Sequence, residues 1–266
     1  MNFWTKKSAE FAQQRNYLDE LYKVYPITPN LRREIPRNKE NNIKLAFDSQ
    51  DNRKLIIELL DLELFPLKDS FVAFLKRDRG SIDRNPQTIN RLAGNLHQMG
   101  FDDMIEKCTE PKETNRQIGP MFKNWIDKGT LGAKIIRDFN SFLKCKENCI
   151  LNISDDAMEK FAREYLGFKR EKGIDFIAKF NNKYIIAETK FLTDFGGHQN
   201  AQFADAVSTM TDSFTDKKVT NEIIPIAIMD GVLYINSNNK MYRYLKEHSE
   251  QIIISSLLLR EFLYSL

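Results

Sequence analysis

The stretch that decides the fold runs GIDFI at residues 173–177, NNK at 181–183 and YIIAETK at 184–190. The two apolar pieces are typical of strands and the polar Asn181-Asn182 pair of a tight turn, so the stretch predicts a β-hairpin. Because side chains alternate faces along a strand, Glu188 and Lys190 lie on the same side of the second strand. The hairpin can bring Asp175 beside them. Such a cluster can hold a hard divalent cation next to an ammonium group, which is what metal-assisted phosphodiester hydrolysis needs.

A plainer interpretation is a solvated hairpin with Asp175 in a turn and Glu188 paired with Lys190 on the surface. Against it, Ile185, Ile186 and Ala187 make the second strand apolar on both faces, as in a buried central strand. Charged residues that end a buried strand favour a functional site.

The spacing of Asp175, twelve intervening residues and then Glu188-Thr189-Lys190 resembles the motif of the PD-(D/E)XK nuclease superfamily, and within it the type II restriction endonucleases. An apolar strand carries each half, a helical pattern precedes the motif, and a polar loop with two glycines follows at residues 193–200. Ile174 stands where the family name has Pro. The resemblance implies an α/β fold with a restriction-endonuclease-like mixed β-sheet flanked by helices. It also implies a Mg²⁺-dependent, sequence-specific double-stranded DNA endonuclease.

The chemistry of a hard cation assigns Asp175, Glu188 and the carbonyl of Thr189 as ligands of Mg²⁺, with Mn²⁺ as a substitute. By resemblance to the family, Lys190 lies beside the attacking water and the scissile phosphate. Many members carry a further acid on the helix before the first strand. Glu159 and Glu164 are both available and both also fit an ordinary helix surface; we favour Glu164, which is nearer the helix end that faces the start of the sheet.

Two polar segments are candidates for DNA contact. At the expected start of the helix after Gly196-Gly197, backbone N–H groups attract phosphate and amide side chains can contact base edges; the alternative is helix capping. Around Gly119-Pro120, polar and basic residues suit DNA contact, but this segment could equally be a capped loop whose aromatic side chains pack in the core. The candidates are His198, Gln199, Asn200 and Gln202 in the first segment, and Asn115, Arg116 and Gln117 in the second.

The chain is expected to divide into a mainly helical region at 1–150, for DNA recognition or support, and a catalytic core at 151–266. Helices are predicted at 8–25, after Asp51 and from Asn85-Pro86, where Asn can cap and Pro suits the first helical position. In the second half we expect helices at 154–167, 198–213, 240–248 and 257–264, and strands at 223–229, 232–235 and 252–254. Asp230-Gly231 is predicted as the tight turn between the first two of these strands.

Composition narrows the class only in part. Lys and Arg number 40 against 37 Asp and Glu, so the net charge of +3 does not mark a nucleic-acid binder, and local basic clusters would have to neutralise phosphates. An odd number of cysteines fits a reducing compartment, and Cys145 and Cys149 have too few partners for a zinc site. With neither a long apolar run nor an apolar signal core, we expect a cytoplasmic protein without membrane contact.

Two other functions remain open: a DNA repair or recombination nuclease of the same fold, and a catalytically silent DNA-binding protein. The intact Asp, Glu and Lys count against the silent protein, and the absence of an ATPase motif such as GxxxxGK[ST] favours a stand-alone restriction enzyme. The expected partners are double-stranded DNA and, in the same system, a cognate DNA methyltransferase that forms no stable complex. A palindromic site would favour a twofold homodimer, and a monomer stays open.

Overall fold

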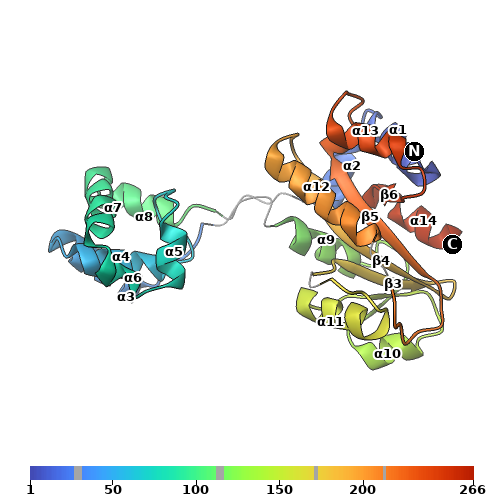
Figure 1. The fold of residues 1–266 in the computed structure, drawn as a ribbon, viewed down its shortest axis with the longest axis horizontal. Coiled ribbons are helices and arrows are strands. Elements are labelled where there is room, and N and C mark those ends of the chain that lie inside the picture. Colours follow the sequence, from blue (N-terminus) through green and yellow to red (C-terminus); the bar gives the residue numbers. More distant parts are fainter. Residues whose placement is uncertain (27–31, 112–116, 171–172, 212–213) are drawn as a thin grey trace. The chain divides into compact units, whose positions relative to one another are not determined.

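A computed structural model describes residues 1–266 except 27–31, 112–116, 171–172 and 212–213. The chain forms two compact units, one from Met1–Ile27 with Thr114–Leu266 and one from Thr28–Glu113 (Figure 1). This division differs from the boundary near residue 150 expected from the sequence. The reason is that an amphipathic pattern predicts a helix without showing which core the helix joins. The first helices and those just after residue 116 pack with the sheet, so the helical unit is an insertion.

The first unit is built on a six-stranded mixed sheet with the strand order β1-β2-β3-β4-β5-β6. The β2–β3 and β3–β4 pairs are antiparallel and the other three are parallel, which confirms the predicted mixed sheet. The strands are β1 Lys134–Ile136, β2 Cys149–Leu151, β3 Phe176–Phe180, β4 Lys183–Leu192, β5 Ile223–Gly231 and β6 Ile253–Ile254.

The predicted hairpin is confirmed as β3 and β4. Phe176 pairs with Ala187 and Phe180 with Lys183, so the turn consists of Asn181 and Asn182. Both asparagines have positive φ angles, 46° and 65°. Asparagine tolerates this left-handed region better than most residues, which explains why the tight turn forms here.

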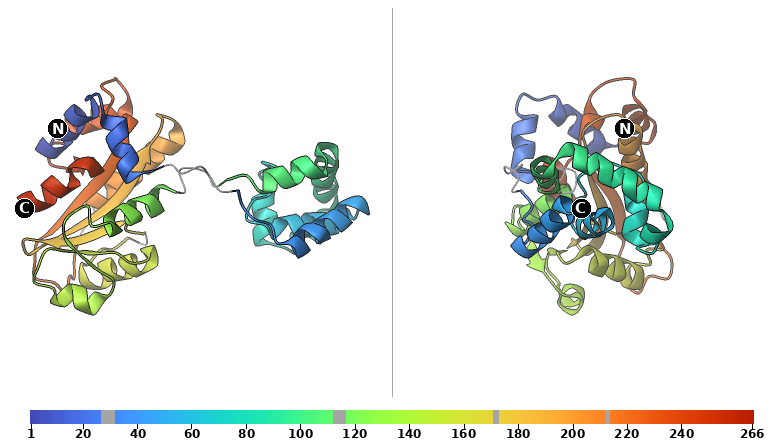
Figure 2. Two further views of the ribbon diagram at one scale, coloured as in Figure 1. Left: turned by 180° about the vertical axis from the view of Figure 1, so that it is seen from behind. Right: turned by 90° about the vertical axis from the view of Figure 1, so that its left-hand side faces the viewer.

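Helices cover both faces of the sheet (Figures 1 and 2). On one face, Phe161 of α11 packs with Ile177 and Ile186. On the other, Phe122 of α9 meets Phe176 with their ring centroids 6.3 Å apart. The helices of this unit are α1 Phe3–Ala12, α2 Tyr17–Val24, α9 Ile118–Asp127, α10 Phe139–Lys144, α11 Asp155–Tyr165, α12 Gly197–Met210, α13 Lys240–Glu247 and α14 Leu259–Ser265, with 3-10 turns η2 Val232–Tyr234 and η3 Ser256–Leu258.

The hairpin expected around Asp230-Gly231 is wrong. Both residues end strand β5, and the apolar residues that follow form η2 instead of a partner strand. Gly231 has a φ of 99°, and a Cβ there would lie 2.0 Å from the carbonyl oxygen of Leu192. The glycine is therefore needed for close approach to β4, and an Asp-Gly pair before an apolar run was not sufficient to predict a hairpin.

Two further differences concern short elements. Strands β1 and β2 were not predicted, because three residues each are too few to show an alternating pattern. The helix expected at 8–25 is two helices, α1 and α2, separated by residues 13–16.

The second unit consists of helices around its own apolar core, which includes Ile43, Leu55, Leu59, Leu92 and Leu96. Asp51 accepts a hydrogen bond from the Lys54 backbone N–H at 3.0 Å, which confirms it as the cap of α4. The helices are α3 Arg37–Asp48, α4 Asn52–Leu60, α5 Val72–Arg77, α6 Ser81–Arg84, α7 Pro86–Met99 and α8 Phe101–Cys108. None of the helices in the described part of the chain, in either unit, is long and apolar enough to cross a membrane.

Candidate active site

The charged residues near the end of β4 form a close pair. Glu188 is 1% exposed, and its Oε1 lies 2.6 Å from Nζ of Lys190. The Lys190 side chain is 25% exposed, so the pair reaches from the buried sheet towards solvent. Burial alone would lower the pKa of Lys190, but the carboxylates of Asp175 and Glu188 raise it above the usual lysine value. The ammonium is therefore held charged beside the two acids.

Asp175 reaches this pair through the backbone of the hairpin. Its backbone N–H donates to the Ala187 carbonyl at 3.2 Å, which continues the β3–β4 ladder by one residue. Its Oδ2 accepts from the backbone N–H of Thr189 at 2.7 Å. The structure thus brings together Asp175, Glu188, Thr189 and Lys190.

The electrostatics of Asp175 are those of a carboxyl poised to ionise. Burial, offset in part by Lys190 and by the Thr189 N–H, raises the pKa of Asp175 to about 6. The negative charges of Glu188 and Asp155 raise it further. A nearby cation would favour the ionised form, because an opposite charge lowers a carboxyl pKa.

Among the described residues, three near the cluster were missed by the sequence analysis: Thr209, Asp155 and Asp205. Asp205 of α12 acts electrostatically on Lys190. Thr209 of α12 is fully buried, and its Oγ1 donates to Oε2 of Glu188 at 3.0 Å. Asp155, at the start of α11, acts electrostatically on Asp175 and is paired with Lys123. The sequence shows Asp155 only as part of a helix start, and nothing in a helical pattern marks which threonine faces a carboxylate.

The donor set fits a hard divalent cation that keeps part of its water shell. Among the described residues, no three His, Cys, Asp or Glu side chains lie close enough to form a metal centre by themselves. Two carboxylates are nevertheless what Mg²⁺ commonly takes from a protein, with water and substrate phosphate as its remaining ligands. Asp175 and Glu188 are the residues that would hold it.

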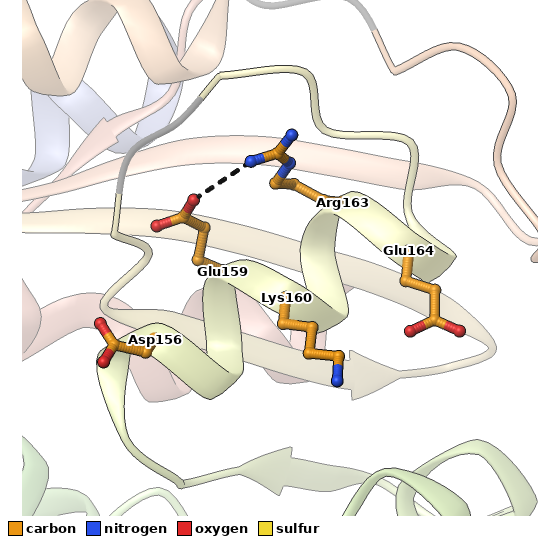
Figure 3. A pocket seen from close by; sticks show the side chains of 5 residues that line it. All are labelled: Asp156, Glu159, Lys160, Arg163 and Glu164. Carbon is orange, nitrogen blue, oxygen red and sulfur yellow. Dashed lines mark ion pairs between the residues drawn. The ribbon is translucent and has the colours of Figure 1, made fainter.

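The structure does not bring Glu159 or Glu164 to this cluster. They line a surface hollow on α11 together with Asp156, Lys160 and Arg163, which Figure 3 shows. Glu159 pairs with Arg163 at 3.6 Å, and Glu164 pairs with Lys218 at 3.2 Å. Glu164 lies nine residues after Asp155, about 14 Å along the helix axis at 1.5 Å per residue. The end of α11 that approaches Asp175 is therefore its start.

At the start of α12, two of the amide side chains hold the preceding loop. Gln199 is 3% exposed, and its Oε1 accepts from the backbone N–H of Thr193 at 3.2 Å. Asn200 donates through Nδ2 to the carbonyls of Phe195 at 2.7 Å and Gly196 at 3.1 Å. For these two residues the structure favours a role in holding the loop over base contact, because Oε1 of Gln199 and Nδ2 of Asn200 bond to loop backbone. Neither caps the helix, whose N-cap is Gly196 without a side-chain hydrogen bond.

The remaining DNA-contact candidates lie in different settings. His198 is exposed, and its Nε2 lies 3.1 Å from Nε2 of Gln202 one turn later. Gln117 precedes α9, whose Met121 and Phe122 are buried, so the aromatic part of that segment packs in the core. Asn115 and Arg116 lie outside the described residues.

A family model described as Tsp45I type II restriction enzyme matches residues 2–266. The chain belongs to this family of type II restriction enzymes. The match covers the hairpin, the cluster at the end of β4 and the helical unit alike, and it agrees with the resemblance drawn from the motif. The expectation of a type II restriction endonuclease is thereby confirmed at the level of the family.

Other comparisons add little. A protein of Flavobacterium psychrophilum described as "Putative cysteine ligase BshC" is 21% identical over 276 residues, covering 94% of this chain and 49% of that protein. The chain thus spans about half the length of this curated relative. No solved structure matches.

Proposed function

We propose that this restriction enzyme is a Mg²⁺-dependent, sequence-specific endonuclease that hydrolyses phosphodiester bonds of double-stranded DNA at a PD-(D/E)XK site. The observation that carries the proposal is the 2.6 Å pair between Lys190 and buried Glu188, with Asp175 held beside it by the Thr189 N–H. Placing the half-buried Asp175 carboxylate beside the buried Glu188 carboxylate is costly unless a cation offsets their charge. Lys190 supplies one such charge, and a metal ion would supply the rest.

Each residue of the cluster has a distinct role in this proposal. Asp175, Glu188 and the carbonyl of Thr189 hold Mg²⁺, or Mn²⁺ in its place, and Lys190 orients the attacking water and balances charge on the scissile phosphate. A bound divalent cation would lower the pKa of water and offset the phosphate charge. Lys190 is suited to its role because the two acids keep it protonated while a quarter of its side chain stays accessible.

The test is cleavage of plasmid DNA by the purified protein, followed by sequencing of the cut ends. We expect defined ends in Mg²⁺ or Mn²⁺, and binding with little turnover in Ca²⁺, because the ligands are hard oxygen donors. Cleavage in excess EDTA would contradict the proposed chemistry. Cut ends at unrelated sequences would contradict specificity while leaving the nuclease assignment intact.

For DNA contact we retain Gln202 and His198 at the exposed start of α12, and Gln117 with Asn115 and Arg116 near α9. Losing one bidentate base contact should cost about 1–3 kcal/mol of discrimination. Binding of Gln202→Ala to the cognate duplex and to a duplex changed by one base, at fixed salt, measures this. Gln14→Ala, at an exposed glutamine beyond α1, is the matched control. Unchanged discrimination in Gln202→Ala would place recognition on other residues.

The proposed partners follow from the function. The host DNA contains the recognition sequence too and must be protected from cleavage. We therefore expect a cognate DNA methyltransferase that modifies the same site without forming a stable complex with the enzyme. A homodimer is expected if the cut ends prove palindromic, since twofold DNA is matched by twofold protein.

A further inference from the structure

We propose that Thr209 is a positioning residue that orients the Glu188 carboxylate for the divalent cation. This inference rests on the proposed function of the cluster and adds a residue from a different element, helix α12. Thr209 is 0% exposed, so bulk water cannot reach its hydroxyl.

The Thr209 hydroxyl has two acceptors within reach and one proton. Oε2 of Glu188 lies 3.0 Å from Oγ1, and the backbone carbonyl oxygen of Asp205 lies 3.5 Å away. The shorter distance and the charge of the carboxylate both favour Glu188, because hydrogen bonds to an ionised acceptor are the stronger ones. The proton therefore belongs to the Thr209–Glu188 bond.

The two oxygens of Glu188 consequently have different partners. Oε2 accepts from Thr209, and Oε1 faces Lys190 at 2.6 Å. Thr209 is fully buried in the helix, next to buried Ala206 and Met210, and close packing in a protein interior restricts the movement of its side chain. The bond from Thr209 holds Oε2 in place and thereby directs Oε1 towards Lys190 and the proposed cation.

Such a contact should act on metal affinity more than on the chemical step. Hydrogen bonds to ligating carboxylates fix their orientation, and removing one typically lowers metal affinity or activity 10- to 100-fold. Thr209→Val keeps the shape of the side chain and removes the donor. Thr209→Ser keeps the donor and should restore the contact.

Calorimetric titration of the full chain with Ca²⁺, in the absence of DNA, tests the inference without relying on cleavage. We expect Thr209→Val to bind Ca²⁺ about 10-fold more weakly than the wild type, and Thr209→Ser to remain within about 3-fold of it. Thr5→Val is the matched control, since Thr5 is another buried threonine, and its hydroxyl accepts from the Ile253 N–H on β6, two strands away from Glu188. It should bind Ca²⁺ like the wild type.

Cleavage supplies a second readout. In Thr209→Val the Mg²⁺ concentration for half-maximal rate should rise about 10-fold, while the rate at saturating Mg²⁺ falls less. Unchanged Ca²⁺ affinity in folded Thr209→Val would overturn the inference and leave the proposed function standing. If Thr209→Val does not fold, Thr209→Ala serves in its place. A wild type that binds no divalent cation would overturn the proposed function, and the inference with it.

Discussion

Two carboxylates lie buried on neighbouring strands of the same sheet, Glu188 on β4 and Asp230 on β5. Both are almost completely inaccessible. Asp230 receives hydrogen bonds from the Tyr25 hydroxyl at 2.9 Å and the Ser255 hydroxyl at 2.5 Å. Glu188 instead pairs with a lysine that reaches solvent. Burial of an acid therefore does not by itself mark an active site; the charge and accessibility of its partners do.

The Asp230 cluster joins distant parts of the chain. Its donors come from the N-terminal segment and from the turn after β6, and the Tyr25 ring lies 5.2 Å from that of Phe191 on β4. Burial raises the pKa of Asp230, and hydrogen bonds from Ser255, Ser256 and Tyr25 oppose that shift. Because its donors are neutral and it is shut off from solvent, this acid stabilises the fold and has no path to a cation or a substrate.

The largest effect should come from the cluster at the end of β4. Lys190→Met or Asp175→Ala should lower the rate of DNA cleavage at least about 100-fold, the scale of losing one preorganised group that stabilises transition-state charge. Specific DNA binding in Ca²⁺ should survive in at least one of the two. Lys183→Met is the control, because Lys183 begins the same strand and pairs only with Glu222 at the surface in the described structure. Equal rates in all three proteins would contradict the assignment of the active site to the end of β4.

Next in size is the stability of the Asp230 cluster. Asp230→Ala leaves two buried hydroxyls and the Ser256 N–H without their acceptor, which should lower the free energy of unfolding by about 2–4 kcal/mol. Urea denaturation measures it, with the exposed Asp19→Ala as control at no more than about 0.5 kcal/mol. A change as small as that of the control would show that the hydrogen bonds of Asp230 contribute little to the free energy of unfolding.

The cost of ionising Asp175 in the folded protein should appear as a pH dependence of stability. Its folded-state pKa of about 6 lies above the ordinary 3.8. The stabilising contribution of the protonated carboxyl is therefore fully present below about pH 3.8 and is lost as the pH rises through 6. Metal-free Asp175→Asn should therefore be more stable than the wild type at pH 8 by about 1–3 kcal/mol. Urea denaturation at pH 8 and 4.5 should show the gain shrinking at the lower pH. A gain that persists at pH 4.5 would assign it to packing instead.

The smallest effect concerns Gln199. Gln199→Leu removes the acceptor of the Thr193 N–H and should lower the free energy of unfolding by about 1 kcal/mol. Its discrimination between cognate and altered DNA should equal that of the wild type. Gln202→Ala is its counterpart on the exposed side of the same helix. If Gln199→Leu alone loses discrimination, the buried glutamine acts in recognition after all.

Local patterns predicted the hairpin, because alternation, an apolar run and an Asn-Asn turn all agree over fifteen residues. They also predicted the helix start at Asn85-Pro86 and the meeting of Asp175, Glu188 and Lys190. They could not predict Thr209 or Asp230, whose partners lie far along the chain: 21 residues separate Thr209 from Glu188, and 205 separate Asp230 from Tyr25. Contacts of that kind depend on how helices pack, which periodicity does not specify.

The most direct test sets the two buried acids against each other. Plasmid cleavage in Mg²⁺ should be measured side by side for the wild type, Glu188→Gln and Asp230→Asn, each confirmed to be folded. Both changes remove a charge and keep the size of the side chain. We predict cutting by the wild type and Asp230→Asn and at least about 100-fold slower cutting by Glu188→Gln. Wild-type cutting by Glu188→Gln would contradict the assignment of the active site to the end of β4.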